Sequence, residues 1–330
     1  MDDAQAPGEL NVQTAALVPD EELWFPDGNV VLEAQGHAFR VYQGLLGYNS
    51  EVFRDLFTVP QPPSAETFDG CPMVHLTDHP EELRHLLRVI FDGKKYYPHH
   101  VRLDFSVVAA LIRLSHKYQI QYVHEDYLSR MKSCFCTDAD QWNEAYIKYG
   151  SSSMAYVNTD AIQAVNIARL TDTVSILPSA LLVCCHLDAN ELLNGSRRLD
   201  DNLERLSKQD IASCINARQE ILYHAIKASM EFLLTPGIPH PEECETQDRC
   251  RDCIERLRAI FLEMHTAGGL LSTAFLTRTA LIRGNRLCGN CRDALCKDEA
   301  EVQPQRHLWA ELPGLLGIEK PVRWPEAPGQ

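Results

Sequence analysis

The segment Asp27-Gly28-Asn29-Val30-Val31-Leu32-Glu33-Ala34-Gln35-Gly36-His37-Ala38-Phe39-Arg40-Val41-Tyr42 decides the fold of the amino-terminal part of this chain. Two apolar runs, at 30–32 and 38–42, flank a short polar stretch that contains Gly36. β-Branched and aromatic residues on both sides of a glycine-containing turn are typical of a β-hairpin. The sequence therefore predicts two strands joined across residues 35–37.

A pattern of helix and strand signals continues after the hairpin. Asn49 or Ser50 can cap a helix whose apolar residues repeat at helical spacing over 52–57. Residues 73–76 predict a third strand, and Asp78 with Glu81 indicates a capping box for a second helix that ends near 92–93. Beyond this point only helices are expected, over 104–118, 122–131, 160–168, 180–186, 207–234, 254–264 and 308–316. The predicted fold class is an α+β domain followed by an all-helical region.

Length and charge restrict the function classes. At 330 residues the chain is long enough for two domains. Its net charge of −15 disfavours binding to phosphate backbones and to anionic lipid, so neither a nucleic-acid partner nor a membrane is expected. No apolar run reaches the length of a membrane span, and the acidic start Met1-Asp2-Asp3 lacks the features of a secretory signal. We therefore expect an intracellular protein, in the cytoplasm or the nucleus.

The twelve cysteines are unevenly distributed, and six of them lie in the last third of the chain. Two pairs there, Cys250 with Cys253 and Cys288 with Cys291, have the Cys-x-x-Cys spacing that can clasp one tetrahedral zinc ion. The sequence leaves three interpretations open: a structural zinc site, reduced buried thiols, or redox chemistry. Cys244 is a rival for one of the four ligand positions.

No catalytic constellation is evident in the sequence. The chain lacks a Gly-x-Ser-x-Gly elbow, a phosphate-binding glycine loop and a His-Glu-x-x-His helix. The pair His99-His100 follows Tyr96-Tyr97-Pro98 in an expected loop, and nothing completes a site around His75. We expect a non-enzymatic protein, and the alternative is an enzyme of unrecognised type in the helical region.

The region around the hairpin resembles the opening of a BTB/POZ domain. The hairpin at 27–42, the pair Leu45-Leu46 and the helix over 49–57 follow one another in the order of that family's elements, and residues 74–93 resemble its second strand and helix. The Asp27-Gly28-Asn29-Val30 opening and Pro60-Gln61-Pro62 are similar to the expanded BTB-domain family of mushroom-forming fungi. Further similarity covers 114–120, 164–169, 177–181 and 287–309.

The resemblance implies a homodimer, because the first strand and the first helix of such domains face the partner subunit. It assigns six residues to the dimer interface: Leu23, Trp24, Phe25, Val52, Phe53 and Leu56. The alternative for the strand is an ordinary edge strand packed on its own sheet, and the helix residues divide between core and interface. It also implies a charged groove, here lined by Asp27, Tyr42 and Gln43. A basic residue usually stands at the position of Gln43, so binding of peptides in this groove is not expected, whereas dimerisation is.

The predicted organisation has three parts: a disordered acidic tail over 1–21, a BTB/POZ domain over 22–131, and a helical region with the cysteine cluster over 132–330. The expected function is association, in which a homodimer presents its helical region to an unidentified protein partner. The alternatives are a substrate adaptor of a cullin-type ubiquitin ligase, which would use the face around 74–93, and a transcription regulator that acts through another protein. Structural zinc is the one cofactor that the sequence suggests.

Overall fold

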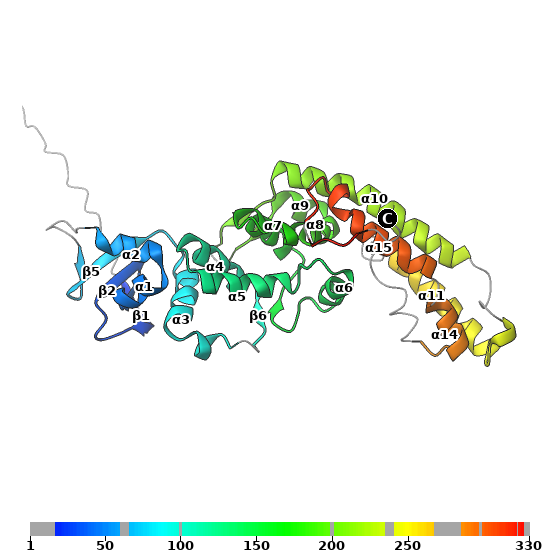
Figure 1. The fold of residues 1–330 in the computed structure, drawn as a ribbon, viewed down its shortest axis with the longest axis horizontal. Helices are drawn as coiled ribbons and strands as arrows, with labels where there is room; N and C mark the ends of the chain where they lie inside the picture. The colour runs from blue at the N-terminus through cyan, green and yellow to red at the C-terminus, as the bar shows by residue number, and fades with distance from the viewer. Residues whose placement is uncertain are drawn as a thin grey trace, which may run out of the picture. The chain divides into compact units, whose positions relative to one another are not determined.

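The computed structural model describes residues 17–59, 66–98, 101–198, 201–234, 241–266, 285–296, 299–321 and 323–326. The chain divides into two compact units, coloured along the sequence in Figure 1. The first unit contains the residues up to Pro98 together with Leu114–Val123, and the second contains His99–Arg113 and the residues from His124 onward. Residues 1–16 of the expected tail, Pro60-Gln61-Pro62 and His99-His100 lie outside the described residues.

The first unit is built on a five-stranded sheet with the order β1-β3-β2-β5-β4. The predicted hairpin is confirmed, because β2 (Val30–Ala34) and β3 (His37–Val41) pair antiparallel. Gln35 and Gly36 both have positive φ angles, of 47° and 86°, which is the conformation that a two-residue hairpin turn requires. The third predicted strand is β5 (Cys71–Leu76), which runs parallel to β2 and pairs antiparallel with β4 (Thr67–Phe68).

Strand β1 begins earlier than the sequence predicted. It covers Val18–Trp24 and runs parallel to β3, so residues 18–21 belong to the sheet and not to a tail. The carboxylate of Asp20 is buried and accepts hydrogen bonds from the backbone N–H groups of Glu22 and Leu23, at 3.0 and 2.8 Å. It also accepts one from Arg84 Nε at 2.6 Å. Polar contacts, rather than alternating apolar residues, therefore hold this end of the strand.

Three helices accompany the sheet: α1 (Gln43–Asn49), α2 (Glu51–Thr58) and α3 (Pro80–Tyr96). Ser50 caps α2, as predicted, since its side chain accepts the N–H of Phe53 at 3.1 Å. The capping residue of α3 is His79 and not Asp78, which corrects the sequence prediction. Helix α3 also continues past Asp92, whose non-helical backbone angles mark a kink where the sequence predicted the end.

The second unit is mainly helical, which confirms the predicted fold class. The helices described in it are α4 (Phe105–Lys117), α5 (Gln121–Lys132), α6 (Ala139–Ile147), α7 (Asp160–Leu170), η1 (Val174–Ile176), α8 (Leu177–His186), α9 (Ala189–Asn194), α10 (Lys208–Leu234), η2 (Pro241–Glu243), α11 (Gln247–Thr266), α14 (Gly289–Cys296) and α15 (Glu299–Leu315). The first residues of α5 and the last of α4 belong to the first unit. Two pairs of two-residue strands were not predicted: β6 (Leu103–Asp104) with β7 (Met154–Ala155), and β8 (Ser196–Arg197) with β9 (Leu203–Glu204).

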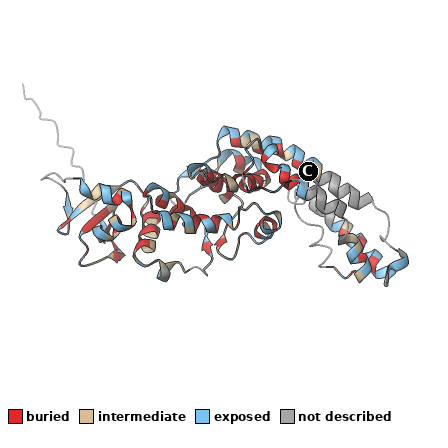
Figure 2. Ribbon diagram, in the orientation of Figure 1, coloured by how far each residue is buried: buried red, intermediate tan, exposed pale blue. Residues whose placement is uncertain are grey.

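The core of the second unit centres on α8, in which every residue from Leu177 to Cys185 is buried (Figure 2). Trp309 on α15 lies between two other tryptophans, with ring centroids 5.4 Å from Trp142 and 4.9 Å from Trp324. Its indole N–H donates to the carbonyl of Thr137 at 2.8 Å, so this helix is joined to a segment 172 positions earlier. Among the described residues, no helix has both the length and the apolar character needed to cross a membrane.

Candidate functional site

The six residues predicted to form a dimer interface fall into two groups. Leu23 is 2% exposed and Phe53 is fully buried, so both side chains belong to the core of their own chain. Phe53 stacks on Tyr118 with ring centroids 4.4 Å apart and an interplanar angle of 9°. The interface assignment of these two residues is therefore corrected, because they have no side-chain surface left for a partner.

The other four residues, Trp24, Phe25, Val52 and Leu56, are half-buried. The indole of Trp24 packs edge-on against Phe68 at 5.9 Å, and Val52 and Leu56 lie one turn apart on α2. Half-buried apolar side chains of this kind keep contact surface that a partner can cover. These four residues thus remain available for the predicted interface.

A shallow depression of about 810 Å³ adjoins α1 and α2. Tyr48, which is 86% exposed, lines it together with Phe57 and Arg54. Gln43 also lines it, so one of the predicted groove residues lies at this surface. The guanidinium of Arg54 supplies a cation here, and it pairs with Glu51 at 3.4 Å. Sequence reasoning missed Arg54, because it considered only the position occupied by Gln43.

The remaining groove residues are joined by hydrogen bonds. The hydroxyl of Tyr42 donates to the carboxylate of Asp27 at 2.5 Å, which raises the pKa of Tyr42. The ring of Tyr42 stacks on Phe25 with centroids 5.1 Å apart, and Phe25 also contacts Phe91 at 5.3 Å. The carboxylate of Asp27 thus bonds to the hydroxyl of Tyr42. In the resemblance, the partner of this carboxylate is a basic residue at the position of Gln43.

Asp78 organises a buried polar network in the first unit. Its carboxylate accepts hydrogen bonds from the hydroxyl of Tyr118 and, at 2.6 Å, from the ammonium of Lys117. Burial, followed by this hydrogen bond, raises the pKa of Tyr118 well above its usual range. The hydroxyl of Ser50 donates to the backbone carbonyl of Tyr118 at 2.6 Å. Residues 114–123 are therefore tied to the first unit by contacts that are distant in sequence.

His75 lies between two carboxylates on the surface of the sheet. Its Nδ1 is 2.6 Å from Glu33 and its Nε2 is 2.7 Å from Glu66, and both hydrogen bonds raise the pKa of the imidazole. Because both ring nitrogens are hydrogen-bonded to carboxylates, the protonated imidazole is favoured. A protonated histidine forms ion pairs with carboxylates but cannot act as a general base.

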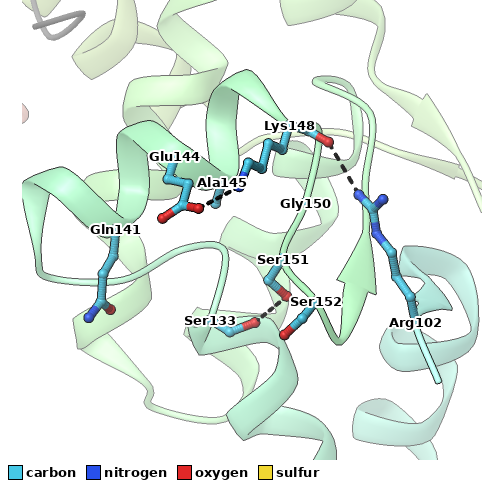
Figure 3. A pocket seen from close by; sticks show the side chains of 9 residues that line it. All are labelled: Arg102, Ser133, Gln141, Glu144, Ala145, Lys148, Gly150, Ser151 and Ser152. Atoms are coloured by element: carbon cyan, nitrogen blue, oxygen red, sulfur yellow. Dashed lines mark hydrogen bonds and ion pairs between the residues drawn. The ribbon is translucent and has the colours of Figure 1, made fainter. Parts of the chain in front are cut away.

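A polar cleft of about 490 Å³ lies in the second unit (Figure 3). The hydroxyl of Ser133 donates to Ser151 at 2.7 Å, and Lys148 forms an ion pair with Glu144. Arg102 donates to the backbone carbonyls of Lys148 and Tyr149. No histidine or cysteine is among the described residues that line the cleft, and Glu144 is directed towards Lys148 rather than towards the serines. The five polar side chains named here therefore bond to one another or to nearby backbone carbonyls.

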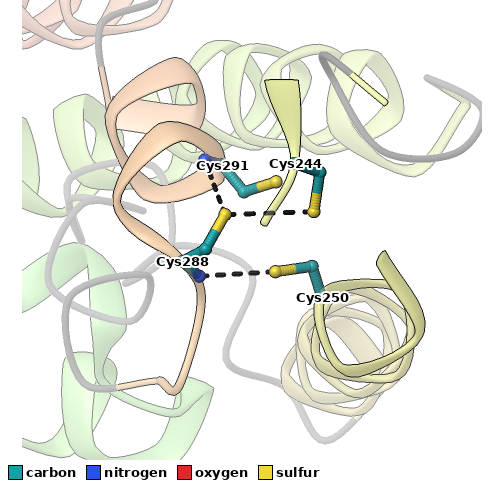
Figure 4. Close-up of side chains that lie close together, drawn as sticks. All are labelled: Cys244, Cys250, Cys288 and Cys291. Carbon is teal, nitrogen blue, oxygen red and sulfur yellow. Dashed lines mark hydrogen bonds between the residues drawn. The ribbon is translucent and has the colours of Figure 1, made fainter. Parts of the chain in front are cut away.

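Four of the six cysteines of the last third form one cluster, shown in Figure 4. The sulfur atoms of Cys244, Cys250, Cys288 and Cys291 all lie within 4.8 Å of one another. Three of the four residues predicted as metal ligands are thus brought together, and Cys244 takes the place predicted for Cys253. The backbone N–H of Cys291 donates to the sulfur of Cys288 at 3.4 Å and helps to lower the pKa of that thiol to about 6.

Comparison with known proteins adds one assignment. Residues 26–133 match the family model of the BTB/POZ domain. No curated protein matches the chain. The matched range contains β2 to β6 and the helices α1 to α5. The sequence predicted the order of the hairpin, α2, β5 and α3 to α5, whereas α1 and β4 were not predicted. BTB/POZ domains are protein–protein interaction modules, and the family is in general non-enzymatic. Residues 26–133 of this chain therefore form a BTB/POZ domain.

Proposed function

We propose that this protein acts by association, as a homodimer formed through its BTB/POZ domain. The observation that carries the proposal is a set of half-buried apolar side chains at the end of β1, directly after it, and on α2: Trp24, Phe25, Val52 and Leu56. The two elements that the family uses to face a partner subunit thus carry apolar surface outside the core of their own chain.

The buried neighbours of these residues give the surface a fixed shape. Phe53, stacked on Tyr118, anchors α2 to the first unit, and Leu23 anchors β1. A surface on anchored elements loses little conformational entropy when a partner covers it. Stable dimer interfaces bury on the order of 1,600 Å², so α1 and the exposed ring of Tyr48 would contribute beside the four residues.

In this proposal the helical region presents the surface for a further protein partner. It carries large apolar side chains that are about half exposed, among them Ile147, Tyr149, Val157, Leu170, Leu193 and Tyr223. A cullin-type scaffold is the alternative partner, and it would contact the first unit around β5 and α3. Co-purification of the folded chain with a cullin scaffold distinguishes these two partners.

The charge and chemistry of the chain fit association rather than catalysis. In the polar cleft, the hydroxyl of Ser133 donates to Ser151. Both ring nitrogens of His75 are hydrogen-bonded to carboxylates, those of Glu33 and Glu66. The resemblance to the expanded family of mushroom-forming fungi and the intracellular location remain predictions from the sequence.

The experiment that tests the dimer compares sedimentation velocity of the wild type with that of the double variant Val52→Asp and Leu56→Asp. The wild type should sediment as a dimer and the double variant as a folded monomer, because two charges would have to be buried at the interface. Leu193→Asp is the matched control, since it makes the same change at a 53% exposed leucine on α9. A double variant that remains a dimer would exclude α2 from the interface.

A further inference from the structure

The cysteine cluster joins three segments of the second unit. Cys244 follows η2, Cys250 lies in the first turn of α11, Cys288 immediately precedes α14, and Cys291 lies in the first turn of α14. Three of these side chains are buried and Cys244 is half-buried. The amide of Asn290 also donates to the carbonyl of Glu243 at 2.7 Å, so the start of α14 is tied to η2 beside the sulfur atoms.

The spacing of the sulfur atoms fits a tetrahedral metal site. Zinc–sulfur bonds of about 2.3 Å place the corners of a tetrahedron about 3.8 Å apart. The sulfur atoms of Cys244 and Cys288 are 3.9 Å apart, and all four lie within 4.8 Å of one another. A disulfide requires about 2.05 Å, and all four cysteines are free thiols.

Backbone N–H groups are directed at two of the four sulfur atoms. The N–H of Cys288 donates to the sulfur of Cys250 at 3.3 Å, and the N–H of Cys291 donates to the sulfur of Cys288 at 3.4 Å (Figure 4). N–H groups directed at sulfur stabilise the thiolate over the thiol. Thiolate is the form in which cysteine binds zinc, and four clustered thiolates without a cation would repel one another.

The surroundings are those of a structural site. The apolar residues Ile254, Leu257 and Leu287 pack against the cluster, and together with the cysteines they form a small local core. Four protein ligands leave no coordination position open for a substrate, whereas catalytic zinc sites usually keep one open.

We propose that Cys244, Cys250, Cys288 and Cys291 bind one zinc ion, which fixes α14 against α11 and η2. Cys253 is not a ligand, although it completes a Cys-x-x-Cys pair with Cys250. It is 3% exposed and belongs to the same apolar core, but its sulfur lies outside the group of four. The zinc site does not depend on dimerisation, because all its ligands lie in the second unit.

The test uses the full-length chain, produced with zinc in the medium and purified under reducing conditions without chelators. Zinc is measured by elemental analysis of the chromatographic peak, and the expected content is one ion per chain. Loss of a residue that only hydrogen-bonds to a metal ligand lowers metal affinity by about 10–100-fold. Cys244→Ser and Cys291→Ser remove a ligand itself, so the zinc affinity of each variant should fall by more than this. Cys253→Ser is the matched control, because it removes a buried thiol one turn from a ligand, and it should keep the full zinc content.

A second readout does not require the variants to fold. Thiol titration of the native wild type should find four cysteines that react only after a chelator removes the metal. Replacement of zinc by cobalt should then give the visible spectrum of tetrahedral sulfur coordination. A wild type that is reduced but free of zinc and does not bind cobalt would overturn the proposal, as would disulfides among the four cysteines in the fresh protein. Loss of zinc in Cys253→Ser with retention in Cys244→Ser would overturn the ligand assignment.

Discussion

Replacing Asp78 by alanine tests the polar network that the structure shows in place of a helix cap. In the structure, the carboxylate accepts hydrogen bonds from the hydroxyl of Tyr118 and from Lys117, while His79 caps α3. Asp78→Ala removes both interactions and leaves the hydroxyl of Tyr118 inside the first unit. If Asp78 were instead a helix cap, its loss would cost about 1 kcal/mol and would not depend on Tyr118.

The magnitude follows from the burial of the two partners. Tyr118 is 3% exposed, so its hydroxyl cannot recover the lost bond from water, and a hydrogen bond to a charged group contributes about 1.5–3 kcal/mol. The side chain of Lys117 is 43% exposed, and such a pair contributes less than about 1 kcal/mol. We expect Asp78→Ala to lower the free energy of unfolding of the first unit by about 3 kcal/mol.

The assay is a double-mutant cycle with Tyr118→Phe, which keeps the ring stacked on Phe53 and removes only the hydroxyl. Native-state hydrogen exchange of the amides in β2 and β3 measures the stability of the first unit, and the amides of α8 serve as the internal reference. The predicted coupling energy is about 1–3 kcal/mol. A coupling energy near zero, with a loss of about 1 kcal/mol for Asp78→Ala alone, would refute the network.

Two further predictions concern stability. Burial lowers the pKa of His85 from 6.5 to about 4, and the hydroxyl of Tyr97 is its partner. The neutral imidazole therefore contributes stability that is fully present above pH 6.5, and on the order of 3 kcal/mol of the free energy of unfolding is lost as the pH falls through 4. The variant His85→Gln lacks this titrating group, so its free energy of unfolding, measured with urea, should depend less steeply on pH in this range. Equal pH dependence in both proteins would contradict this. In Gly195→Ala, a Cβ atom would lie 2.0 Å from the carbonyl of Glu204 at a φ of +89°, and thermal unfolding should show a loss of at least about 2 kcal/mol. Gly314→Ala, on α15 with open space around it, should be neutral or slightly stabilising, and equal effects of the two changes would rule out the steric explanation.

Elements whose conformation depends on residues close in sequence could be predicted from the sequence. The β2–β3 hairpin follows from two apolar runs and the Gln35-Gly36 turn, and the cap of α2 follows from Ser50. The early start of β1 was not predictable, because Asp20 is held by Arg84, which lies 64 positions away. Asp78 was mistaken for a cap for the same reason, since its partners Lys117 and Tyr118 are about 40 positions away.

In the candidate sites, too, features set by residues close in sequence were predicted, and features set by distant contacts were not. Cysteine spacing predicted that the last third could hold a metal, and three of the four clustered cysteines were named from it. Cys253 lies outside the cluster because α11 continues through it and its side chain packs in the apolar core. The chain before the helix brings Cys244, which the sequence left as a rival ligand, to the other sulfur atoms. At the proposed interface, the pattern of apolar residues on β1 and α2 could not separate the buried Leu23 and Phe53 from their half-buried neighbours.

The solution mass of the full-length wild type tests the central claim most directly. Multi-angle light scattering over a range of protein concentrations measures this mass without reference to molecular shape. A homodimer through the BTB/POZ domain predicts twice the chain mass of 37.3 kDa. A mass of 37.3 kDa at every accessible concentration would contradict association through this domain and leave the chain a monomer.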